Sequence, residues 1–204
     1  MDLNKVFEER RSVNFFNPQK QIEEETLKNI INLAVLAPSA FNLQPWELIA
    51  VQSEEAKNKL FPLTGNQPKI KEAPVTLIVV GDLEGYKPEN TAWNDLEIML
   101  NNKQALENYQ KNAYSLYGTT KERSIKFAES NAGLLAMSIM YAAKYYGVDS
   151  HAMSGIDFDG INKAFSLGES KTVVMLIALG YFDESRKLYP RRSRKSYYDI
   201  VTKV

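Results

Sequence analysis

Two short segments carry residue types suited to binding a charged, polar ligand. Residues 10–12 are Arg-Arg-Ser, and guanidinium groups beside a hydroxyl suit the geometry of a phosphate. Residues 37–46, Ala-Pro-Ser-Ala-Phe-Asn-Leu-Gln-Pro-Trp, place Ser39, Asn42 and Gln44 between two prolines. Such a segment is stiff and polar and is poorly suited to a core. We therefore interpret it as a ligand-binding loop, and the upstream arginines indicate that the ligand carries an anion.

A second basic cluster lies near the C-terminus, where residues 191–195 are Arg-Arg-Ser-Arg-Lys. A phosphate dianion needs more than one cation to offset the hydration that it loses on binding. Either basic cluster could supply them. Two alternatives remain open: each cluster alone is compatible with a solvated basic face, and the C-terminal one is compatible with a nucleic-acid patch.

The composition limits the chemistry that the chain can perform. Among 204 residues, Lys+Arg and Asp+Glu both number 25, and the zero net charge gives no global attraction to nucleic acid or acidic lipid. The absence of cysteine excludes disulfides, thiolate catalysis and cysteine-ligated metals. The single histidine, His151, excludes a multi-histidine metal site, and we interpret it as a partly buried structural histidine. No G-x-G-x-x-G or P-loop motif is present, which argues against a Rossmann or P-loop nucleotide site.

The chain shows no signal for a membrane. Its longest apolar runs fall well short of the roughly 20 residues of a membrane span, and its N-terminal residues lack the apolar core of a signal peptide. We therefore expect a cytoplasmic protein with no membrane partner, no nucleic-acid partner and no metal.

Hydrophobic periodicity predicts the elements that position these segments. A continuous apolar, mostly β-branched run at residues 75–80 predicts a strand buried on both faces. Residues 120–146 are apolar nearly all round, which is typical of a helix at a domain centre or in a subunit interface. Residues 82–120 are weakly periodic and predict helices and loops outside the main core. The remaining predicted helices span residues 2–12, 22–36, 54–61 and 159–167, and the remaining predicted strands span residues 47–52 and 173–179. Helices outnumber strands and separate them, so the class is α+β or α/β with a small central sheet.

Several motifs in order along the chain resemble the nitroreductase family of FMN-dependent oxidoreductases. The resemblance covers nearly the whole chain, and relatives of the bacterial nitroreductase-like quinone reductase type are the most similar. The motifs are Arg10-Arg11-Ser12, Ala37-Pro38-Ser39-x-x-Asn42-x-Gln44-Pro45-Trp46, Asn66-Gln67-x-Lys69, Ser130-x-x-x-x-Leu135-Ala136-Met137, Ser154-Gly155, Leu179-Gly180-Tyr181 and Arg192-x-Arg194.

The resemblance implies a fold and an assembly. It implies one α+β domain over residues 1–204, in which helices flank a small, mostly antiparallel central sheet. A long central helix would lie in an interlocked homodimer, with FMN at the subunit interface. The segment 82–120 would be a helical and loop excursion, and a C-terminal tail over about residues 183–204 would extend over the partner. The two basic clusters would then converge on one phosphate.

The resemblance also assigns roles to individual residues. Lys69 is the candidate that stabilises reduced FMN, which is anionic at N1, and the flavin itself carries the redox chemistry. The proposed FMN-binding residues are Arg10, Arg11, Ser12, Arg192 and Arg194 at the phosphate and ribityl end, Ser39 and Asn42 reaching the partner's FMN, Asn66 and Lys69 at the pyrimidine edge, and Ser154 and Gly155 by the ring near N5. The proposed substrate-pocket residues are Phe41, Tyr114 and Tyr117.

Two positions depart from the family pattern, and the expected reaction follows from the rest. Asn14 stands where many relatives carry a basic residue, and Ser154 stands where some carry an acid. We expect ping-pong turnover, in which NADH or NADPH passes hydride to flavin N5 and a quinone, nitroaromatic or similar flat acceptor then takes it. The alternative is another flavin reaction on the same fold, namely dehalogenation, dehydrogenation or flavin breakdown.

Overall fold

A four-stranded antiparallel sheet forms the centre of the molecule. The computed structural model describes residues 2–204 and orders the strands β1-β2-β4-β3. All three strand pairs are antiparallel, which confirms the expected α+β class. The strands are β1 (Trp46–Val51), β2 (Val75–Asp82), β3 (Asp149–Met153) and β4 (Lys171–Gly180).

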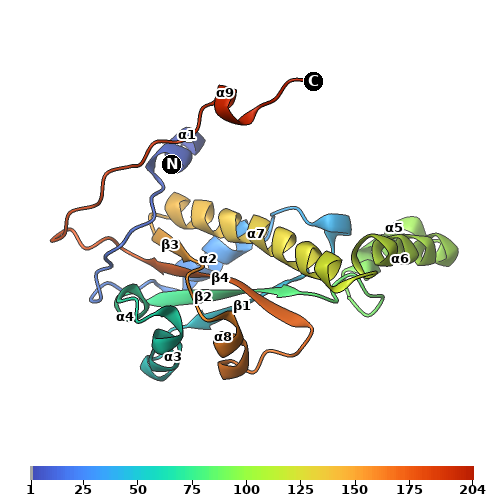
Figure 1. The fold of residues 1–204 in the computed structure, drawn as a ribbon, viewed down its shortest axis with the longest axis horizontal. Helices are drawn as coiled ribbons and strands as arrows, with labels where there is room; N and C mark the ends of the chain where they lie inside the picture. The colour runs from blue at the N-terminus through green and yellow to red at the C-terminus, as the bar shows by residue number, and fades with distance from the viewer. Residues whose placement is uncertain (1) are drawn as a thin grey trace.

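Helices cover both faces of the sheet (Figure 1). Helices α2 and α7 pack on one face, and α3, α4 and α8 pack on the other. The helices are α1 (Leu3–Glu9), α2 (Glu24–Ala34), α3 (Glu54–Leu60), α4 (Lys69–Glu72), α5 (Trp93–Leu100), α6 (Lys103–Tyr117), α7 (Lys121–Tyr145), α8 (Phe158–Ala164) and α9 (Tyr197–Ile200), with short 3-10 helices η1 (Ala40–Asn42) and η2 (Phe61–Thr64).

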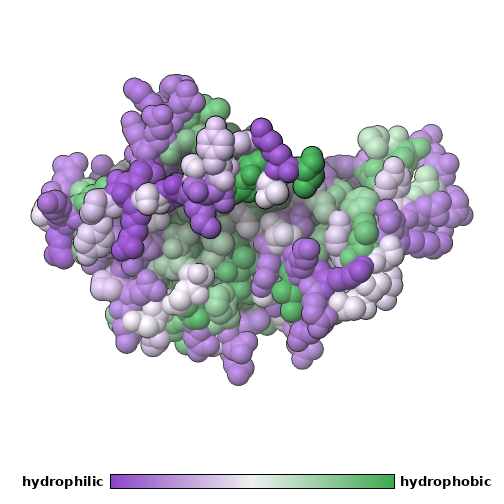
Figure 2. Space-filling view, turned by 45° about the horizontal axis from the view of Figure 1, so that its top comes forward, coloured by the Kyte–Doolittle hydropathy of each residue, from purple (hydrophilic) through white to green (hydrophobic). Residues whose placement is uncertain are grey.

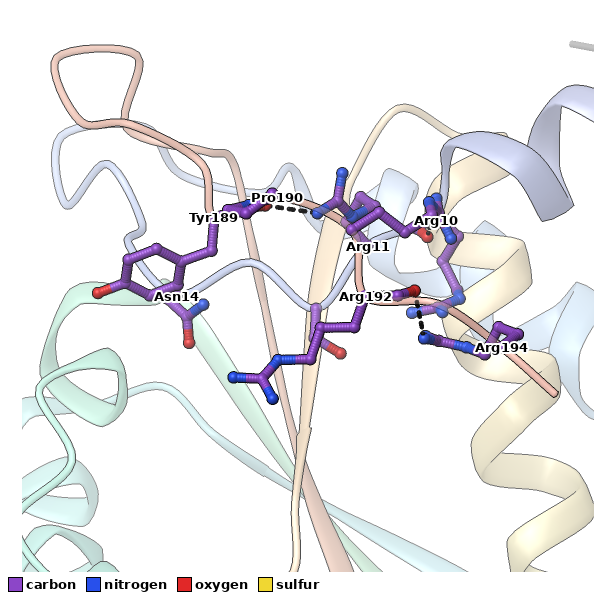
Figure 3. A pocket seen from close by; sticks show the side chains of 9 residues that line it. Arg10, Arg11, Asn14, Tyr189, Pro190, Arg192 and Arg194 are labelled. Carbon is purple, nitrogen blue, oxygen red and sulfur yellow. Dashed lines mark hydrogen bonds between the residues drawn. The ribbon is translucent and has the colours of Figure 1, made fainter.

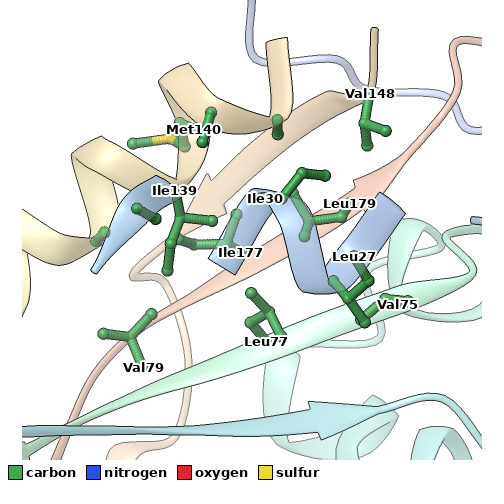
Figure 4. Close-up of a cluster of buried hydrophobic side chains, with 14 of the residues drawn as sticks. Leu27, Ile30, Val75, Leu77, Val79, Ile139, Met140, Val148, Ile177 and Leu179 are labelled. Atoms are coloured by element: carbon green, nitrogen blue, oxygen red, sulfur yellow. The ribbon is translucent and has the colours of Figure 1, made fainter. Parts of the chain in front are cut away.

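Strand β2 lies in the middle of this sandwich. Its residues from Val75 to Gly81 are all buried, which confirms the prediction of a strand covered on both faces. Successive side chains point to opposite faces. Figure 4 shows Leu77 of β2 and Ile177 of β4 facing Ile30 of α2 and Ile139 of α7. Residues between them, such as Ile78, join the core on the opposite face.

The long helix α7 begins and ends where the sequence predicts. The Thr120 hydroxyl accepts from the Arg123 N–H at 3.3 Å and caps the first turn. At the other end Gly147 adopts φ 75°, a left-handed conformation that glycine adopts without strain, and its N–H bonds to the Lys144 carbonyl. One side of α7 packs on the sheet, whereas Leu134 and Tyr145 on its other side are exposed.

The excursion between β2 and α7 has a small core of its own. Helices α5 and α6 project at one end of the molecule (Figure 1). Trp93 and Leu106 pack there with Leu43 and with Phe127 of α7, apart from the two clusters on the sheet. The segment therefore packs around its own small cluster of apolar side chains.

Two local expectations were wrong, and one short helix was not predicted. The helix predicted over residues 2–12 ends at Glu9, because Arg10 takes an extended ψ of 126° and Ser12 forms a parallel bridge with Ser150. The helix predicted over 159–167 ends at Ala164, where Ser166 adopts a left-handed φ of 55°. The short helix α4 was not predicted, because a four-residue helix has no measurable periodicity.

The described residues contain neither a helix that could span a membrane nor a group of side chains that could hold a metal ion. No helix among residues 2–204 combines the length and hydropathy needed to cross a membrane. Over the same residues, no group of three or more His, Cys, Asp or Glu side chains is placed to hold a metal ion.

Candidate functional site

The two basic clusters of the sequence line one pocket. Figure 3 shows side chains from residues 10–14 and from residues 189–194 around a hollow of about 600 Å³. The pocket therefore joins segments from opposite ends of the chain. Its lining residues are Arg10, Arg11, Ser12, Asn14, Tyr189, Pro190, Arg191, Arg192 and Arg194.

Hydrogen bonds to backbone carbonyls hold these two segments together. Arg11 Nη2 donates to the Tyr189 carbonyl at 2.6 Å. Arg191 Nη2 donates to the Arg10 carbonyl at 3.1 Å and to the Glu8 carbonyl. The start of the tail thus lies on the N-terminal segment of its own chain. The expected extension of residues 183–204 over a partner stays a prediction.

Positive charge dominates this arginine pocket. Burial lowers the pKa of Arg10, and the positive charges of Arg191, Arg194 and Arg11 lower it further, against an opposing effect of Tyr141. No acidic side chain of residues 2–204 lines the pocket. Since like charges crowd together without a counter-charge, an anion bound here relieves their repulsion.

A second group of predicted site residues gathers around Gln67. Its amide nitrogen donates to the Gly155 carbonyl at 3.4 Å, and its amide oxygen accepts from Lys69 Nζ at 3.1 Å. Asn66 adopts a left-handed φ of 58°, and Ser154 is exposed beside Gly155. The structure thus brings the two motifs into contact. Gln67, which joins the two motifs, belongs to the Asn66-Gln67-x-Lys69 motif, but the sequence comparison assigned no role to it.

Half-burial gives Lys69 an unusual environment. Desolvation lowers the pKa of its ammonium, and the nearby Glu72 carboxylate partly opposes this. A lysine that is half removed from water gains by contact with an added negative charge. This lysine cluster, namely Asn66, Gln67, Lys69, Ser154 and Gly155, therefore also favours an anionic group.

Strand β3 connects the arginine pocket to the lysine cluster. Ser12 bridges Ser150, and the Val13 N–H donates to the Ser150 carbonyl at 3.1 Å. The next residue of β3, His151, lies 2.8 Å from the Val13 carbonyl through Nδ1. Lys69 lies close enough to His151 to lower the pKa of the imidazole. The two groups of site residues are therefore neighbours on one side of β3.

The polar loop that carries Ser39 and Asn42 is a separate site in this chain. Neither residue lines the arginine pocket. The Ser39 hydroxyl accepts from the Gln44 N–H at 2.9 Å, and Asn131 of α7 accepts from the Ala40 N–H at 2.9 Å. Three residues of the loop have left-handed φ values, at Phe41, Asn42 and Gln44. Backbone strain of this kind is concentrated at functional sites. Contact with a partner's cofactor stays a prediction.

Aromatic residues predicted for the substrate pocket share one cluster. The Phe41 ring lies 6.2 Å from the Tyr117 ring, and Tyr117 stacks on Phe127 at 4.5 Å between centroids. Tyr114 lies against Tyr86 instead, at 6.2 Å. Tyr117 and Phe127 also line a hollow of about 370 Å³. The structure thus brings Phe41 to Tyr117, and it adds Phe127, which the sequence reading missed among many apolar residues of α7.

The family assignment follows from comparison with known proteins. A model of the Nitroreductase family matches residues 7–181. The chain belongs to the nitroreductase family. It is 30% identical over 202 residues, covering 98% of both chains, to MhqN of Bacillus subtilis (strain 168), which carries the provisional name NAD(P)H nitroreductase. The resemblance drawn from the motifs is thereby confirmed.

Two further relatives show the range of this nitroreductase family. The enzyme named CLA biosynthesis enone reductase from Lactiplantibacillus plantarum is 31% identical over 184 residues, covering 88% of this chain and 85% of that enzyme. A provisionally named nitroreductase from Exiguobacterium sibiricum, solved in complex with FMN, is 26% identical with a TM-score of 0.83. The match covers 99% of this chain and 97% of that one. The nitroreductase-like fold is therefore shared along the whole chain.

The two departures from the family pattern have defined positions in the structure. Asn14 lines the arginine pocket and adds no charge there. Ser154 is exposed at the end of β3, next to the glycine whose carbonyl accepts from Gln67. This nitroreductase-family site therefore has an uncharged side chain at both positions that depart from the family pattern.

Proposed function

We propose that this nitroreductase-family chain binds FMN along the side of β3, from the arginine pocket to the lysine cluster. The single observation that carries the proposal is the convergence of the two basic clusters on one pocket. Guanidinium groups suit a phosphate, and no acid among residues 2–204 competes for them there. The cations, amide groups and open space at Gly155 fit the chemistry of a flavin mononucleotide.

The chain is an FMN-dependent NAD(P)H oxidoreductase of the nitroreductase type. When bound, FMN would supply the redox chemistry between NADH or NADPH and a flat acceptor such as a quinone or nitroaromatic, in ping-pong turnover. The protein would bind and orient the cofactor. Arg10, Arg11 and Arg192 would hold its phosphate end, Gln67 would offer amide groups to the ring, and Lys69 would stabilise negative charge.

A second copy of the chain completes the site in this proposal. Apolar residues of α1, of α2 and the segment after it, and of α7 are exposed and line a hollow of about 490 Å³, among them Leu3, Leu33, Leu36, Leu134 and Tyr145. Figure 2 shows hydrophobic side chains that reach the surface among hydrophilic ones on the face that it displays. Exposed apolar surface of this extent is typical of a subunit interface. A homodimer would bury it and bring Ser39 and Asn42 to the partner's FMN.

The function is tested by cofactor uptake followed by reduction. Purified protein should be yellow or should take up added FMN, and either NADH or NADPH should bleach the flavin absorbance under anaerobic conditions. An acceptor panel should then restore the absorbance, and it should include quinones, nitroaromatics and, because of the enone reductase relative, conjugated enones. Protein that takes up no FMN would contradict the proposal. FMN that stays bound but is reduced by neither nicotinamide would favour dehalogenation, dehydrogenation or flavin breakdown.

Replacing Lys69 by methionine should lower the midpoint potential of bound FMN. The ammonium stabilises the negative charge of the reduced cofactor, and at a half-exposed position we expect that effect to be about 1–2 kcal/mol. The measurement is an anaerobic redox titration against a reference dye. Lys71→Met on the same helix is the matched control, because Lys71 bonds to Asn58 instead. A potential that is the same in Lys69→Met and wild type would remove this role from Lys69.

A further inference from the structure

His151 is the only histidine of the chain, and its environment fixes which nitrogen carries the proton. Its Nδ1 lies 2.8 Å from the Val13 carbonyl oxygen. A carbonyl can only accept, so Nδ1 must be the protonated nitrogen and must donate. In the neutral ring Nε2 then holds a free lone pair. Nε2 has no hydrogen-bond partner among residues 2–204, and this atom is not fully buried. It is therefore available to a bound molecule.

This imidazole sits between the two parts of the proposed cofactor site. Val13, which it binds, is flanked by Ser12 and Asn14, and both of these line the arginine pocket. Lys69 of α4 is close enough to lower the pKa of the imidazole. His151 is therefore adjacent to the arginine pocket through Val13 and is near the Lys69 ammonium of the lysine cluster.

Burial and the nearby positive charge both favour the neutral form of His151. Desolvation lowers the pKa of the imidazole, the Lys69 ammonium lowers it further, and the bond to Val13 opposes both. The carboxylates on neighbouring elements are engaged elsewhere: Glu72 of α4 accepts from the Phe16 N–H at 3.3 Å, and Asp149 of β3 accepts from the Phe182 N–H at 3.0 Å. On the adjoining segment Arg10 and Arg11 add positive charge and Asn14 adds none. Neither carboxylate raises the pKa of the His151 imidazole.

We propose that His151 is a residue of the cofactor site, and that its Nε2 takes up a proton from solvent when the bound FMN becomes anionic on reduction. The inference rests on the proposed function. A negative charge held beside Lys69 is also close to His151 and favours its charged form. Because Asn14 is uncharged, the protonated imidazole becomes the second positive charge next to Lys69. The hydride comes from NAD(P)H and the proton from water, so the step is balanced.

The experiment uses nuclear magnetic resonance on untagged protein, in which the single histidine gives one unambiguous set of ring resonances. The pKa of His151 is titrated in protein with oxidised FMN and again after anaerobic reduction with dithionite. We expect the neutral Nδ1–H form with a pKa below the ordinary value of about 6.5 in the oxidised state. On reduction the pKa should rise by about one unit or more. Equal pKa values in the two states would overturn the inference, whereas failure to bind FMN would instead overturn the proposed function.

Two variants separate a site role from a purely structural one. Lys69→Met in FMN-free protein should raise the pKa of His151, because it removes the ammonium beside the ring. His151→Gln can still donate to the Val13 carbonyl but cannot titrate. At pH values between the oxidised-state and reduced-state pKa of His151, reduction of the wild-type protein takes up one extra proton. In that pH range the midpoint potential of the wild type should therefore fall more steeply with pH than that of His151→Gln. Identical pH dependence in the two proteins would overturn the inference.

Discussion

Replacing Arg192 and Arg194 together by alanine should weaken FMN binding by about 100-fold or more. Both residues line the pocket that also contains Arg10 and Arg11. A hydrogen bond to a charged group contributes about 1.5–3 kcal/mol, which corresponds to about tenfold or more in affinity for each arginine. Fluorescence titration of FMN into the double variant measures the loss directly.

Two controls show whether this loss belongs to the pocket. Lys187→Ala with Lys195→Ala removes the same charge from exposed tail positions that do not line it, and should change FMN affinity by less than about threefold. The FMN-free Arg192 and Arg194 variant should also unfold at an unchanged denaturant concentration, since both side chains are exposed among like charges. Equal losses in the two double variants would show that only the overall charge of the tail matters.

Replacing Leu134 by arginine should convert a dimer to monomers and release the cofactor. Leu134 is 48% exposed on α7 and lines the apolar hollow between α1, α2 and α7. In a two-fold symmetric dimer each subunit contributes the same substitution to the interface. The Leu134→Arg dimer would therefore bury two unpaired arginine charges against apolar surface. We expect a penalty above about 3 kcal/mol for each dimer, or more than 100-fold in the dissociation constant. Light scattering after gel filtration measures mass, and absorbance measures the flavin retained.

The matched control places the same charge on the opposite side of the sheet. Phe158 of α8 is 41% exposed, similar to Leu134, but lies with the helices on the other face. Phe158→Arg should stay dimeric and should keep FMN. A Leu134→Arg variant that is monomeric but retains FMN at wild-type affinity would show that Ser39 and Asn42 do not reach a partner's cofactor. A variant that stays dimeric would show that this face is not the interface.

Elements with strong local signals were predictable from the sequence. Strand β2 is recognisable as a β-branched apolar run, and α7 by its length and its apolar residues. Helix α3 has a local signal too, since the Ser53 hydroxyl accepts from the Ala56 N–H at 3.1 Å and caps its first turn. These features depend on neighbours within a few residues. Edge strand β3 has a much weaker local signal, because its five residues, paired on one side to β4, show little alternation.

The sequence by itself determined which side chains can bind an anion and which loop is too polar and stiff for a core. It also placed the chain in its family, because the motifs follow one another in a characteristic order. The family resemblance implied that the two basic clusters converge, but only the tertiary structure shows which residues of both termini line the pocket and that His151 lies near Lys69. The physical reason is that backbone carbonyls make the decisive contacts, those of Tyr189, Arg10 and Val13. Every residue type has such a carbonyl, so the pattern of side chains does not indicate which distant segment will accept the hydrogen bond.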